Sequence, residues 1–509
     1  MSSGEHNKAA LGYTVTVVVG TLKRIAEAVL YALGGAIVVL LIGFVLYLEN
    51  RPDLKIWHTA ELDEEFTTKS DVNSFEEYLA LEDRLFDQLD ELVYEGIEAN
   101  DRRLINRFYR GSESDPQRWP SNWNRSFVFE ADEPVAGVLL LHGLSDSPYS
   151  LRNLGQRLHG EGVYVIGLRL PGHGTAPVGL VSVTWEDMAA AVRLAMIHLR
   201  DQADDRPLYM VGYSNGAPLS IHYTLSALQD PDLPMTDRLV LISPAIGISE
   251  LAVFAVWQER LGRLLGLRKL AWNAILPEYD PYKYQSFAVN AATLARRLTI
   301  LVQNDLKNLS SDGGLERFPP VLAFQSVVDA TVSTPAVIGD LFMRLPLGSS
   351  ELVLFDLNRE TEIEQILSHD PLETLRTMFA DRERHFDLQL LMNENHHSRR
   401  VVIRCTRAGG ELVREVATGL EWPDGIYSMS HVALPFPYDD PLYGADEDVE
   451  SPGIQIGTMD LRGERGVLQI PAADMLRLRW NPFYRYLEGR VLGFLGVAEE
   501  TEHRCLITD

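Results

Sequence analysis

Ser214 stands between Gly212 and Gly216 in the stretch "LYMVGYSNGAPLS", where an apolar run leads into a short turn and a helix-like segment follows. A serine on such a sharp strand-to-helix turn presents its hydroxyl outward, and flanking glycines leave room for the turn. Free N–H groups at the start of the following helix favour negative charge at the same place. The pattern predicts a nucleophilic serine, with a serine in an ordinary glycine-rich turn as the alternative.

A nucleophilic serine needs amide groups that stabilise the oxyanion formed during its attack. One such N–H comes from the residue after the nucleophile, here Asn215, and the other from the loop after an earlier strand. The apolar run "GVLLL" ends in His142-Gly143-Leu144, so the Leu144 amide is the second candidate. We expect His142 to bond the neighbouring backbone rather than to act as a base.

The elements that must position these residues form an alternating pattern. From residue 126 onward, helical windows separate most of the short apolar runs, which are "SFVFE", "GVLLLHG", "VYVIGLRL", "PLYMVGYS", "RLVLISPA" and "VLAFQSVVD". Continuously apolar strands separated by helices indicate a mostly parallel sheet that is covered on both faces. Reactive groups in such sheets lie at the carboxyl ends of the strands. The sequence therefore predicts an α/β fold with its chemistry just after the apolar runs.

The stretch "VLLLHGLSDSPYSLRNLGQRLHGEGVYVIGLRLPGHGTAP" and the turn at Ser214 resemble the α/β-hydrolase superfamily. The resemblance is to the branch that holds carboxylesterases, monoacylglycerol lipases, lysophospholipases and the peptidases grouped with them. It covers residues 126–345 and a short piece near residue 431. The "HG" loop, "PGHG" and the serine turn are more specific in this order than any one alone. The resemblance implies a chain order of serine, acid and histidine, so both partners should follow Ser214.

Asp329 is the candidate acid because it follows the strand-like run "VLAFQS" and precedes a helix that begins near Thr334. An aspartate in this place can accept a hydrogen bond from an imidazole and stabilise its protonated form. The residue also resembles the family's acid position. The alternatives are that Asp329 only caps the helix or turn, and that Asp340 in the next helix is the acid.

His431 is the candidate base. The family's histidine should follow the last core strand, which we identify as "ELVLF" (351–355). In "GIYSMSHVALPFPYDDPLYG", His431 follows an apolar segment and precedes a proline-rich, inflexible loop that can hold an imidazole still. The alternatives lie in helical, charged or solvated stretches and are His369, His385, His396 and His397.

With His431 as the base, residues 356–425 form an insertion between acid and base. Its stretch "RRVVIRCTRAGGELVREVA" predicts a β-hairpin that turns at Gly409-Gly410. The hairpin either extends the sheet or pads the site. The last core strand is then either "ELVLF" or "VVIRC".

A helical block at about 246–315 is expected to form a cap over the serine, because such blocks line the acyl or alcohol pocket in hydrolases of this type. The candidate substrate-binding residues are Tyr213, Tyr282, Tyr284 and Phe287. The alternative is that these side chains only pack inside the protein. The acidic stretch 438–450 fits no calcium loop and is expected to be a solvated surface. We expect neither a metal nor a cofactor.

Residues 28–48, "AVLYALGGAIVVLLIGFVLYL", carry no charged side chain. As an α-helix they would extend about 30 Å, the thickness of the hydrocarbon core of a bilayer. Lys23 and Arg24 precede them, so the positive-inside rule places residues 1–27 in the cytoplasm and the body in the periplasm or outside the cell. We expect a single-pass anchor in the inner membrane. A cleaved signal peptide is the alternative, although "YLENRPDL" offers no small-x-small cleavage site.

Residues 49–125 contain an acidic amphipathic helix at 71–97, which we expect to be an outer layer on the body at 126–509 rather than a partner-binding helix. The formal charge of -26 argues against nucleic acid as a partner, since phosphate binding needs clustered Lys and Arg. Cys405 and Cys505 either form a disulfide or stay as buried thiols.

Together these features predict a membrane-anchored serine hydrolase that cleaves a carboxylic ester, either a small molecule or a lipid. Ser214, His431 and Asp329 would form its catalytic triad and act through an acyl-enzyme. A serine peptidase of the same fold and a non-catalytic membrane-anchored scaffold are the alternatives. The oligomeric state is left open.

Overall fold

The computed structural model describes residues 4–247, 267–360, 366–379, 383–409, 412–459, 461, 463–464 and 467–499. The chain divides into two compact units, Met1–Asp53 and Leu54–Asp509. Helix α1 (Gly4–Glu49) makes up most of the first unit. Its segment Gly20–Glu49 contains an 18-residue window with a mean hydropathy of 2.7 and is long and apolar enough to cross a membrane, a test that a signal sequence also passes. The predicted span 28–48 lies within this segment.

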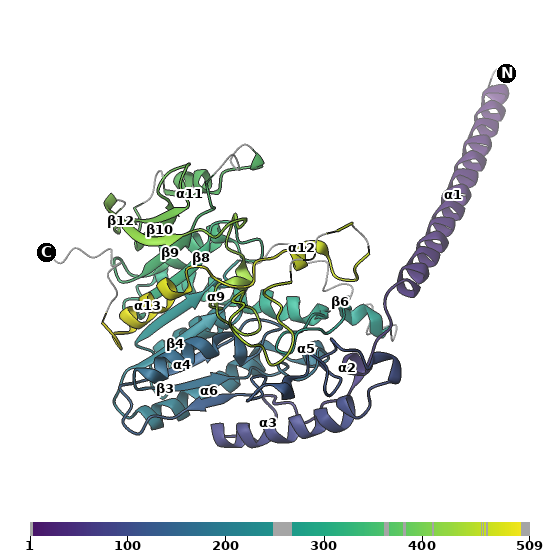
Figure 1. The fold of residues 1–509 in the computed structure, drawn as a ribbon. Helices are drawn as coiled ribbons and strands as arrows, with labels where there is room; N and C mark the ends of the chain where they lie inside the picture. Colours follow the sequence, from purple (N-terminus) through teal and green to yellow (C-terminus); the bar gives the residue numbers. More distant parts are fainter. Residues whose placement is uncertain are drawn as a thin grey trace. The chain divides into compact units, whose positions relative to one another are not determined.

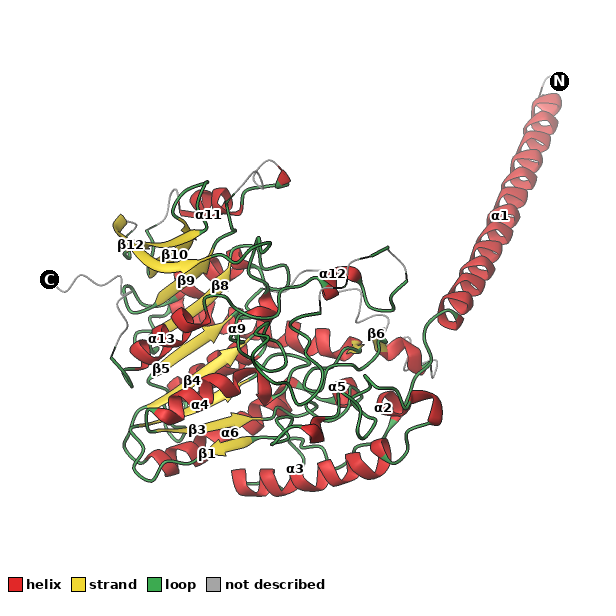
Figure 2. Cartoon of the chain, viewed as in Figure 1, coloured by secondary structure: helices red, strands yellow, loops and turns green. Residues whose placement is uncertain are grey.

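A ten-stranded sheet forms the centre of the second unit (Figures 1 and 2). In spatial order its strands are β1 (Phe127–Phe129), β3 (Val163–Leu168), β2 (Ala136–Leu141), β4 (Leu208–Tyr213), β5 (Arg238–Ile242), β8 (Val321–Ser326), β9 (Glu351–Phe355), β10 (Asp387–Asn393), β11 (Arg400–Thr406) and β12 (Leu412–Glu421). The strands from β3 to β10 run parallel, whereas β1, β11 and β12 are antiparallel to their neighbours. The predicted mostly parallel α/β sheet is confirmed.

Both faces of the sheet are covered because successive side chains of a strand point to opposite faces. On one face, residues such as Leu139 and Met210 pack under α6 (Trp185–Ala203), α7 (Gly216–Gln229) and α9 (Val289–Ser311). On the other, residues such as Val138 and Val211 pack under α4 (Arg152–Gly160) and α13 (Tyr484–Leu495). This double coverage explains why the strands are continuously apolar in sequence.

Residues 54–125 form an N-terminal layer with α2 (Ile56–Thr59) and α3 (Phe75–Leu89). The hydroxyl of Ser74 caps α3 by accepting a hydrogen bond from the amide of Glu77, and acids occupy its first turn. The apolar stripe of α3 places Phe75 and Tyr78 in the main core, against α6 (Figure 1). The layer is therefore packed on the body.

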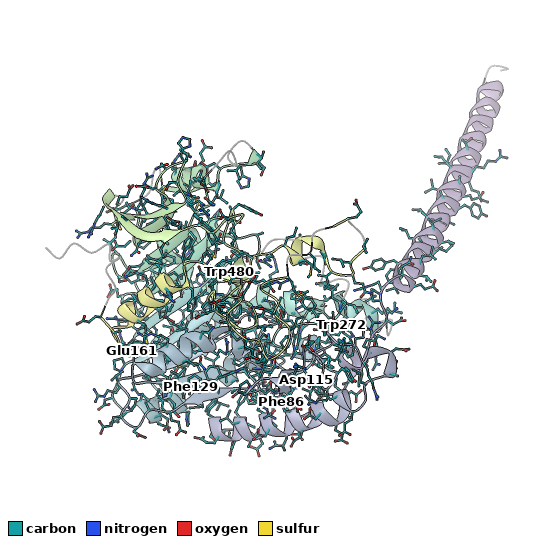
Figure 3. All side chains as sticks on the ribbon, viewed as in Figure 1. Phe86, Asp115, Phe129, Glu161, Trp272 and Trp480 are labelled. Carbon is teal, nitrogen blue, oxygen red and sulfur yellow. The ribbon has the colours of Figure 1, made fainter. Side chains whose placement is uncertain are left out.

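The predicted cap at 246–315 differs from expectation in its second half. Residues 248–266 lie outside the described residues. After them come a small antiparallel hairpin of β6 (Trp272–Ala274) and β7 (Phe287–Ala288) and then α9. Helix α9 packs on α7 and buries its apolar stripe in the main core, so it covers the sheet. The side chain of Trp272, labelled in Figure 3, is fully buried in β6.

The predicted insertion at 356–425 extends the sheet. Strand β10 pairs with β9, which is the "ELVLF" run, and β11 contains the "VVIRC" run at the next position. Strand β12 completes the predicted hairpin, whose turn residue Gly410 lies outside the described residues. Cys405 in β11 is buried and disulfide-bonded, and Cys505 lies outside the described residues.

Short helices connect these elements: η1 (Asp90–Tyr94), η2 (Ala99–Asp101), η3 (Pro116–Arg118), η4 (Pro148–Leu151), α5 (Gly179–Ser182), η5 (Arg268–Ala271), α10 (Thr334–Ala336), η6 (Val337–Leu341), η7 (Phe342–Arg344), α11 (Pro371–Phe379), η9 (His431–Ala433) and α12 (Ala472–Met475). Two of them matter for the site. Helix η9 carries His431, and the turn that ends in α10 follows Asp329.

Candidate active site

Ser214 occupies the turn between β4 and α7 with a φ of 51°, in the left-handed region. This conformation costs a non-glycine residue about 1–2 kcal/mol. The Ser214 amide donates to the carbonyl of Ile242 at 2.9 Å and so ties the turn to β5. A Cβ on Gly212 would lie 2.6 Å from the carbonyl oxygen of Gly216, and one on Gly216 would lie 2.1 Å from that of Leu141. Backbone cannot yield at these distances, so both positions require glycine.

The imidazole of His431 lies between Ser214 and Asp329. Its Nε2 is 2.9 Å from Oγ of Ser214, and its Nδ1 is 2.8 Å from Oδ2 of Asp329. The side chain of His431 is 5% exposed and that of Asp329 is fully buried. An imidazole in this arrangement can take a proton from the hydroxyl while the carboxylate orients the ring.

The carboxylate of Asp329 is held by several donors. Its Oδ1 accepts hydrogen bonds from the amides of Thr331 and Val332, at 2.8 and 2.9 Å. Burial by itself would raise the pKa of Asp329. The neighbouring His431 and these two amides outweigh burial and hold the pKa below its usual value. The group therefore stays ionised beside the imidazole.

The alternative acid and bases lie elsewhere. Asp340 accepts a hydrogen bond from Gln303 at 3.2 Å and pairs with Arg344. The alternative histidines are on the surface or partly exposed, and no hydrogen bond joins any of their rings to Ser214 or Asp329 within the described residues; they are His369, His385, His396 and His397. Among the predicted candidates, the structure brings only His431 and Asp329 to the serine.

The 142–146 loop, which follows β2, lies against the serine turn, since a Cβ on Gly143 would be 3.1 Å from Cβ of Ser214. Neither the amide of Leu144 nor that of Asn215 donates a hydrogen bond to another described residue. Both N–H groups are therefore free for a ligand. As predicted, His142 bonds its neighbouring backbone, with its Nδ1 2.9 Å from the carbonyl oxygen of Gly143.

The predicted substrate-binding residues lie mostly in the interior, in contrast to the expectation that they line a pocket. Tyr213 packs in the core, and its hydroxyl donates to the carbonyl of His431 at 3.4 Å. Tyr282 stacks on Tyr149 with ring centroids 4.2 Å apart. Tyr284 is buried and donates to the carbonyl of Gly172 at 3.3 Å. Phe287 in β7 is half-buried. Each of these aromatic side chains packs against other segments of the protein. The sequence alone does not show which segments these are.

A cavity of about 350 Å³ lies away from the serine, between residues 60–65 of the N-terminal layer and residues 178–182. Ser214, Asp329 and His431 are not among the residues that line it. Its walls carry the acids Glu61, Asp63 and Glu65 and the hydroxyl-bearing Ser182.

Gln325 is a site residue that the sequence reasoning missed. It lies at the carboxyl end of β8, is fully buried, and donates from Nε2 to Oδ2 of Asp329 at 3.1 Å and to Oγ1 of Thr334 at 3.3 Å. The sequence does carry a sign of this role, since Gln325 is a polar residue in an otherwise apolar buried strand. A buried polar side chain needs a specific hydrogen-bond partner.

Residues 132–305 match the family model described as serine aminopeptidase, S33. A thermostable monoacylglycerol lipase from Bacillus sp. (strain H-257) is 30% identical over 137 residues, which are 27% of this chain and 52% of that protein. The chain thus spans about half the length of this curated relative.

Two solved structures to which the chain is similar are a metagenome-derived lipolytic enzyme of the LipS and LipT pair and a monoacylglycerol lipase from Paleococcus ferrophilus. The match to the first has a TM-score of 0.36 and 21% identity, and it covers 50% of this chain and 97% of that enzyme's chain. The match to the second has a TM-score of 0.35 and 20% identity, and it covers 45% of this chain and 88% of that lipase's chain. The sheet has the α/β-hydrolase arrangement, and residues 132–305 are similar to the branch of this fold that holds monoacylglycerol lipases and esterases.

Proposed function

We propose that the protein is a membrane-anchored serine hydrolase that cleaves carboxylic esters through an acyl-enzyme. The observation that carries the proposal is the position of His431, whose two ring nitrogens lie within hydrogen-bonding distance of Ser214 and Asp329. This arrangement supplies a nucleophile, a base and a group that orients the base. The free amides of Leu144 and Asn215 support the same reading, because acyl transfer needs donors for an oxyanion.

In the first step, Oγ of Ser214 attacks the ester carbonyl carbon while its proton passes to Nε2 of His431. The carbonyl oxygen becomes an oxyanion that the amides of Leu144 and Asn215 stabilise. The carbon–oxygen bond to the alcohol then breaks, and the departing alcohol takes the proton from Nε2. The acyl group remains on Ser214 as an ester.

In the second step, a water molecule attacks the acyl carbon and gives its proton to Nε2 of His431. A second oxyanion forms at the same two amides and collapses as the bond to Oγ of Ser214 breaks. The proton returns from Nε2 to Oγ, and the carboxylic acid leaves. Asp329 stays ionised throughout and stabilises the protonated imidazole, for which its lowered pKa is suited.

The proposed substrate is an ester of a small molecule or a lipid. The relative from Bacillus is named a monoacylglycerol lipase, which favours an acylglycerol-like ester. Helix α1 is the proposed anchor, with residues 1–27 in the cytoplasm, residues 28–48 in the inner membrane and the catalytic body on the other side. Such an anchor would hold the enzyme at a lipid surface.

The activity is tested with the purified full-length protein in detergent, using p-nitrophenyl esters of graded acyl length and a fluorophosphonate probe. The wild type is expected to turn over esters and to be labelled, and Ser214→Ala is expected to lose both. Labelling that persists in Ser214→Ala would move the nucleophile elsewhere. A wild type that does neither would leave the non-catalytic scaffold as the better reading.

The same fold also hosts peptidases, and the matching family model bears such a description. A peptidase that recognises a free amine needs an unpaired acid near the serine. Asp146 of the 142–146 loop is already paired, with Lys283 Nζ at 3.0 Å. The carboxylate of this loop is thus engaged, and the relative from Bacillus is named a lipase, so we favour the ester as substrate. Turnover of aminoacyl arylamides without turnover of p-nitrophenyl esters would reverse this preference.

Anchoring is tested separately on the full chain expressed in a bacterial host. Retention in the membrane fraction after alkaline carbonate extraction is expected for an uncleaved span. A protease added to intact spheroplasts should degrade a tag at the C-terminus and spare one at the N-terminus. Loss of the N-terminal tag from the mature protein would instead indicate a cleaved signal peptide.

A further inference from the structure

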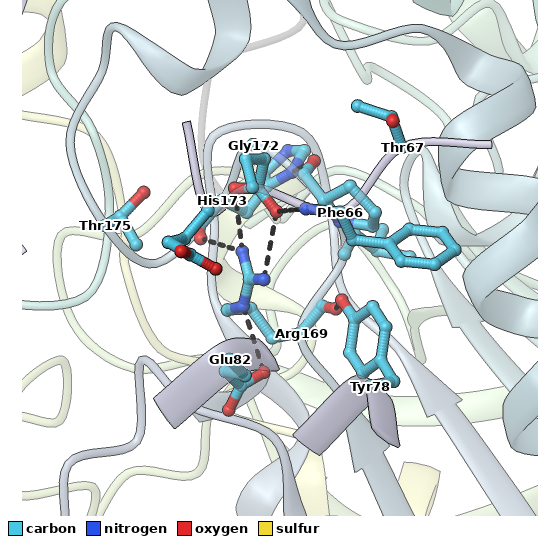
Figure 4. A network of polar contacts seen from close by, with 12 residues as sticks. Phe66, Thr67, Tyr78, Glu82, Arg169, Gly172, His173 and Thr175 are labelled. Atoms are coloured by element: carbon cyan, nitrogen blue, oxygen red, sulfur yellow. Dashed lines mark hydrogen bonds and ion pairs between the residues drawn. The ribbon is translucent and has the colours of Figure 1, made fainter. Parts of the chain in front are cut away.

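The N-terminal layer makes a buried charged contact with the body beside the site. Arg169 follows strand β3, and its side chain is 1% exposed. Its Nε donates to Oε2 of Glu82 at 2.9 Å, and its Nη1 and Nη2 donate to the two carboxylate oxygens of Glu65 at 3.1 and 3.0 Å. Figure 4 shows the guanidinium between Glu82, which belongs to α3, and the turn at Gly172 and His173. Two acids at these distances hold the buried guanidinium of Arg169 in one position.

Both acids lie outside the segment that matches the family model, which begins at residue 132. Further contacts join the layer to the same place. The hydroxyl of Tyr78 donates to the carbonyl of Arg169 at 2.6 Å. The amide of Arg169 donates at 2.9 Å to Oγ of Ser126, which in turn donates to Oε2 of Glu82 at 2.8 Å. The layer therefore fixes the main chain of Arg169 as well as its side chain.

The residues next to Arg169 reach the 142–146 loop. Nη1 of Arg169 donates to the carbonyl of His173 at 3.1 Å, and the His173 ring packs edge-on against the His142 ring with centroids 5.0 Å apart. The amide of Leu170 donates to Nε2 of His142 at 3.1 Å. Two separate contacts thus run from the Arg169 segment to one imidazole.

The hydrogen bonds of His142 determine its tautomer. The Leu170 amide can only donate, so Nε2 is the acceptor and the proton of a neutral ring sits on Nδ1. Burial, with smaller effects of His173 and Arg169, places the pKa of His142 well below its usual value, so the ring is neutral. Nδ1–H then donates to the carbonyl of Gly143.

The carbonyl of Gly143 and the amide of Leu144 belong to one planar peptide unit, so a hydrogen bond on the first fixes the direction of the second. The Leu144 amide is one of the two proposed oxyanion donors. We propose that Arg169 is a positioning residue for the oxyanion site and that Glu65 and Glu82 hold it in place. The N-terminal layer would then support the geometry of the active site through these two acids. This inference rests on the proposed esterase function.

The test compares Glu65→Gln with Glu64→Gln in the full-length protein in detergent. Glu65→Gln removes the negative charge of one of the two carboxylates that pair with the Arg169 guanidinium, whereas Glu64 makes an exposed pair with Arg84 in the same layer. For Glu65→Gln we expect kcat on p-nitrophenyl esters to fall about 10-fold or more with KM nearly unchanged. The reason is that the Leu144 amide would no longer point at the oxyanion, which forms in the transition state and is absent from the bound substrate. The rate of fluorophosphonate labelling should fall in parallel, while its final stoichiometry stays that of the wild type. Glu64→Gln should match the wild type in each.

Equal kcat in Glu65→Gln and Glu64→Gln would overturn the inference while leaving the esterase function intact. So would a loss of activity explained entirely by fewer labelled sites. If Glu65→Gln does not fold, Tyr78→Phe takes its place, because it removes only the hydrogen bond to the Arg169 carbonyl. A kcat loss of about threefold or more would then support the inference, and an unchanged kcat would overturn it. A wild type without esterase activity would overturn the proposed function and this inference together.

Discussion

Nε2 of Gln325 donates a hydrogen bond to Oδ2 of Asp329, the same carboxylate oxygen that accepts from His431. The distances are 3.1 Å to Gln325 and 2.8 Å to His431. The remaining oxygen, Oδ1, is taken by backbone amides. The acid is thus saturated with donors, so it cannot rotate without losing one of them.

Replacing Gln325 by glutamate tests this arrangement. Gln325→Glu keeps the size of the side chain but sets a second carboxylate beside Asp329. Like charges favour protonation of one acid or of the nearby imidazole, so we expect kcat/KM at pH 7 to fall about 10-fold and its acid limb to move to higher pH. Gln303→Glu is the matched control, because Gln303 makes a similar bond to Asp340 away from the site. The same shift in both variants, or in neither, would contradict the role of Gln325.

The strained turn at Ser214 predicts opposite effects on activity and stability. Ser214→Gly and Ser214→Ala both lack the hydroxyl and should both be inactive. Glycine accepts the φ of 51° without a Cβ clash. We therefore expect Ser214→Gly to be more stable than Ser214→Ala, with a free energy of unfolding about 1 kcal/mol larger. Thermal and chemical unfolding in detergent measure the difference. Equal stability of the two variants would mean that the turn stores no strain.

The glycine at position 216 should be indispensable for packing reasons. A Cβ there would lie 2.1 Å from the carbonyl oxygen of Leu141, so we expect Gly216→Ala to lose about 1–3 kcal/mol of stability together with the proposed esterase activity. Gly339→Ala serves as the control, since a Cβ at that position meets nothing within 4 Å. Unfolding and turnover assays on both variants check this. A wild-type-like Gly216→Ala would show that the turn can open.

Asp440 predicts a pH-dependent stability. Its buried carboxylate pairs with Arg152 at 2.9 Å and accepts from the hydroxyl of Tyr149 at the same distance. Burial would raise the pKa of Asp440, but Arg152 and two backbone amides outweigh it, so the folded pKa is lowered. The stabilisation is then fully present above the unfolded pKa of about 4 and is lost as pH falls through the lower folded value. Asp440→Asn should cost about 3 kcal/mol at pH 7, because it leaves a buried guanidinium unpaired.

The deficit of Asp440→Asn relative to the wild type should shrink between about pH 5 and pH 3, which unfolding measured across this range checks. Asp424→Asn provides the contrast. Asp424 is 94% exposed and pairs with Arg399 on the surface, where ion pairs contribute little. Its stability should follow the wild type at every pH. A deficit of Asp440→Asn that stays constant down to pH 3 would contradict the lowered pKa.

Local features of the chain were readable from its sequence. The serine turn is encoded within a few residues, because its strand, its glycines and its helix are neighbours in the chain and backbone sterics admit few alternatives. The parallel sheet follows from apolar runs separated by helices, and the apolar helix near the N-terminus follows from an uncharged stretch of sufficient length. Each of these signals depends on adjacent residues alone.

Tertiary structure decided what lies beyond the reach of such signals. His431 is 102 residues from Asp329 and 217 from Ser214, and only the packing of the loops at the carboxyl ends of the strands shows which of several histidines meets them. The same packing turns Tyr282 and Tyr284 inward and brings Glu65 onto Arg169. Sequence periodicity tells which residues are apolar or charged, but it does not say which distant surface each of them meets, since that depends on how the whole sheet and its layers assemble.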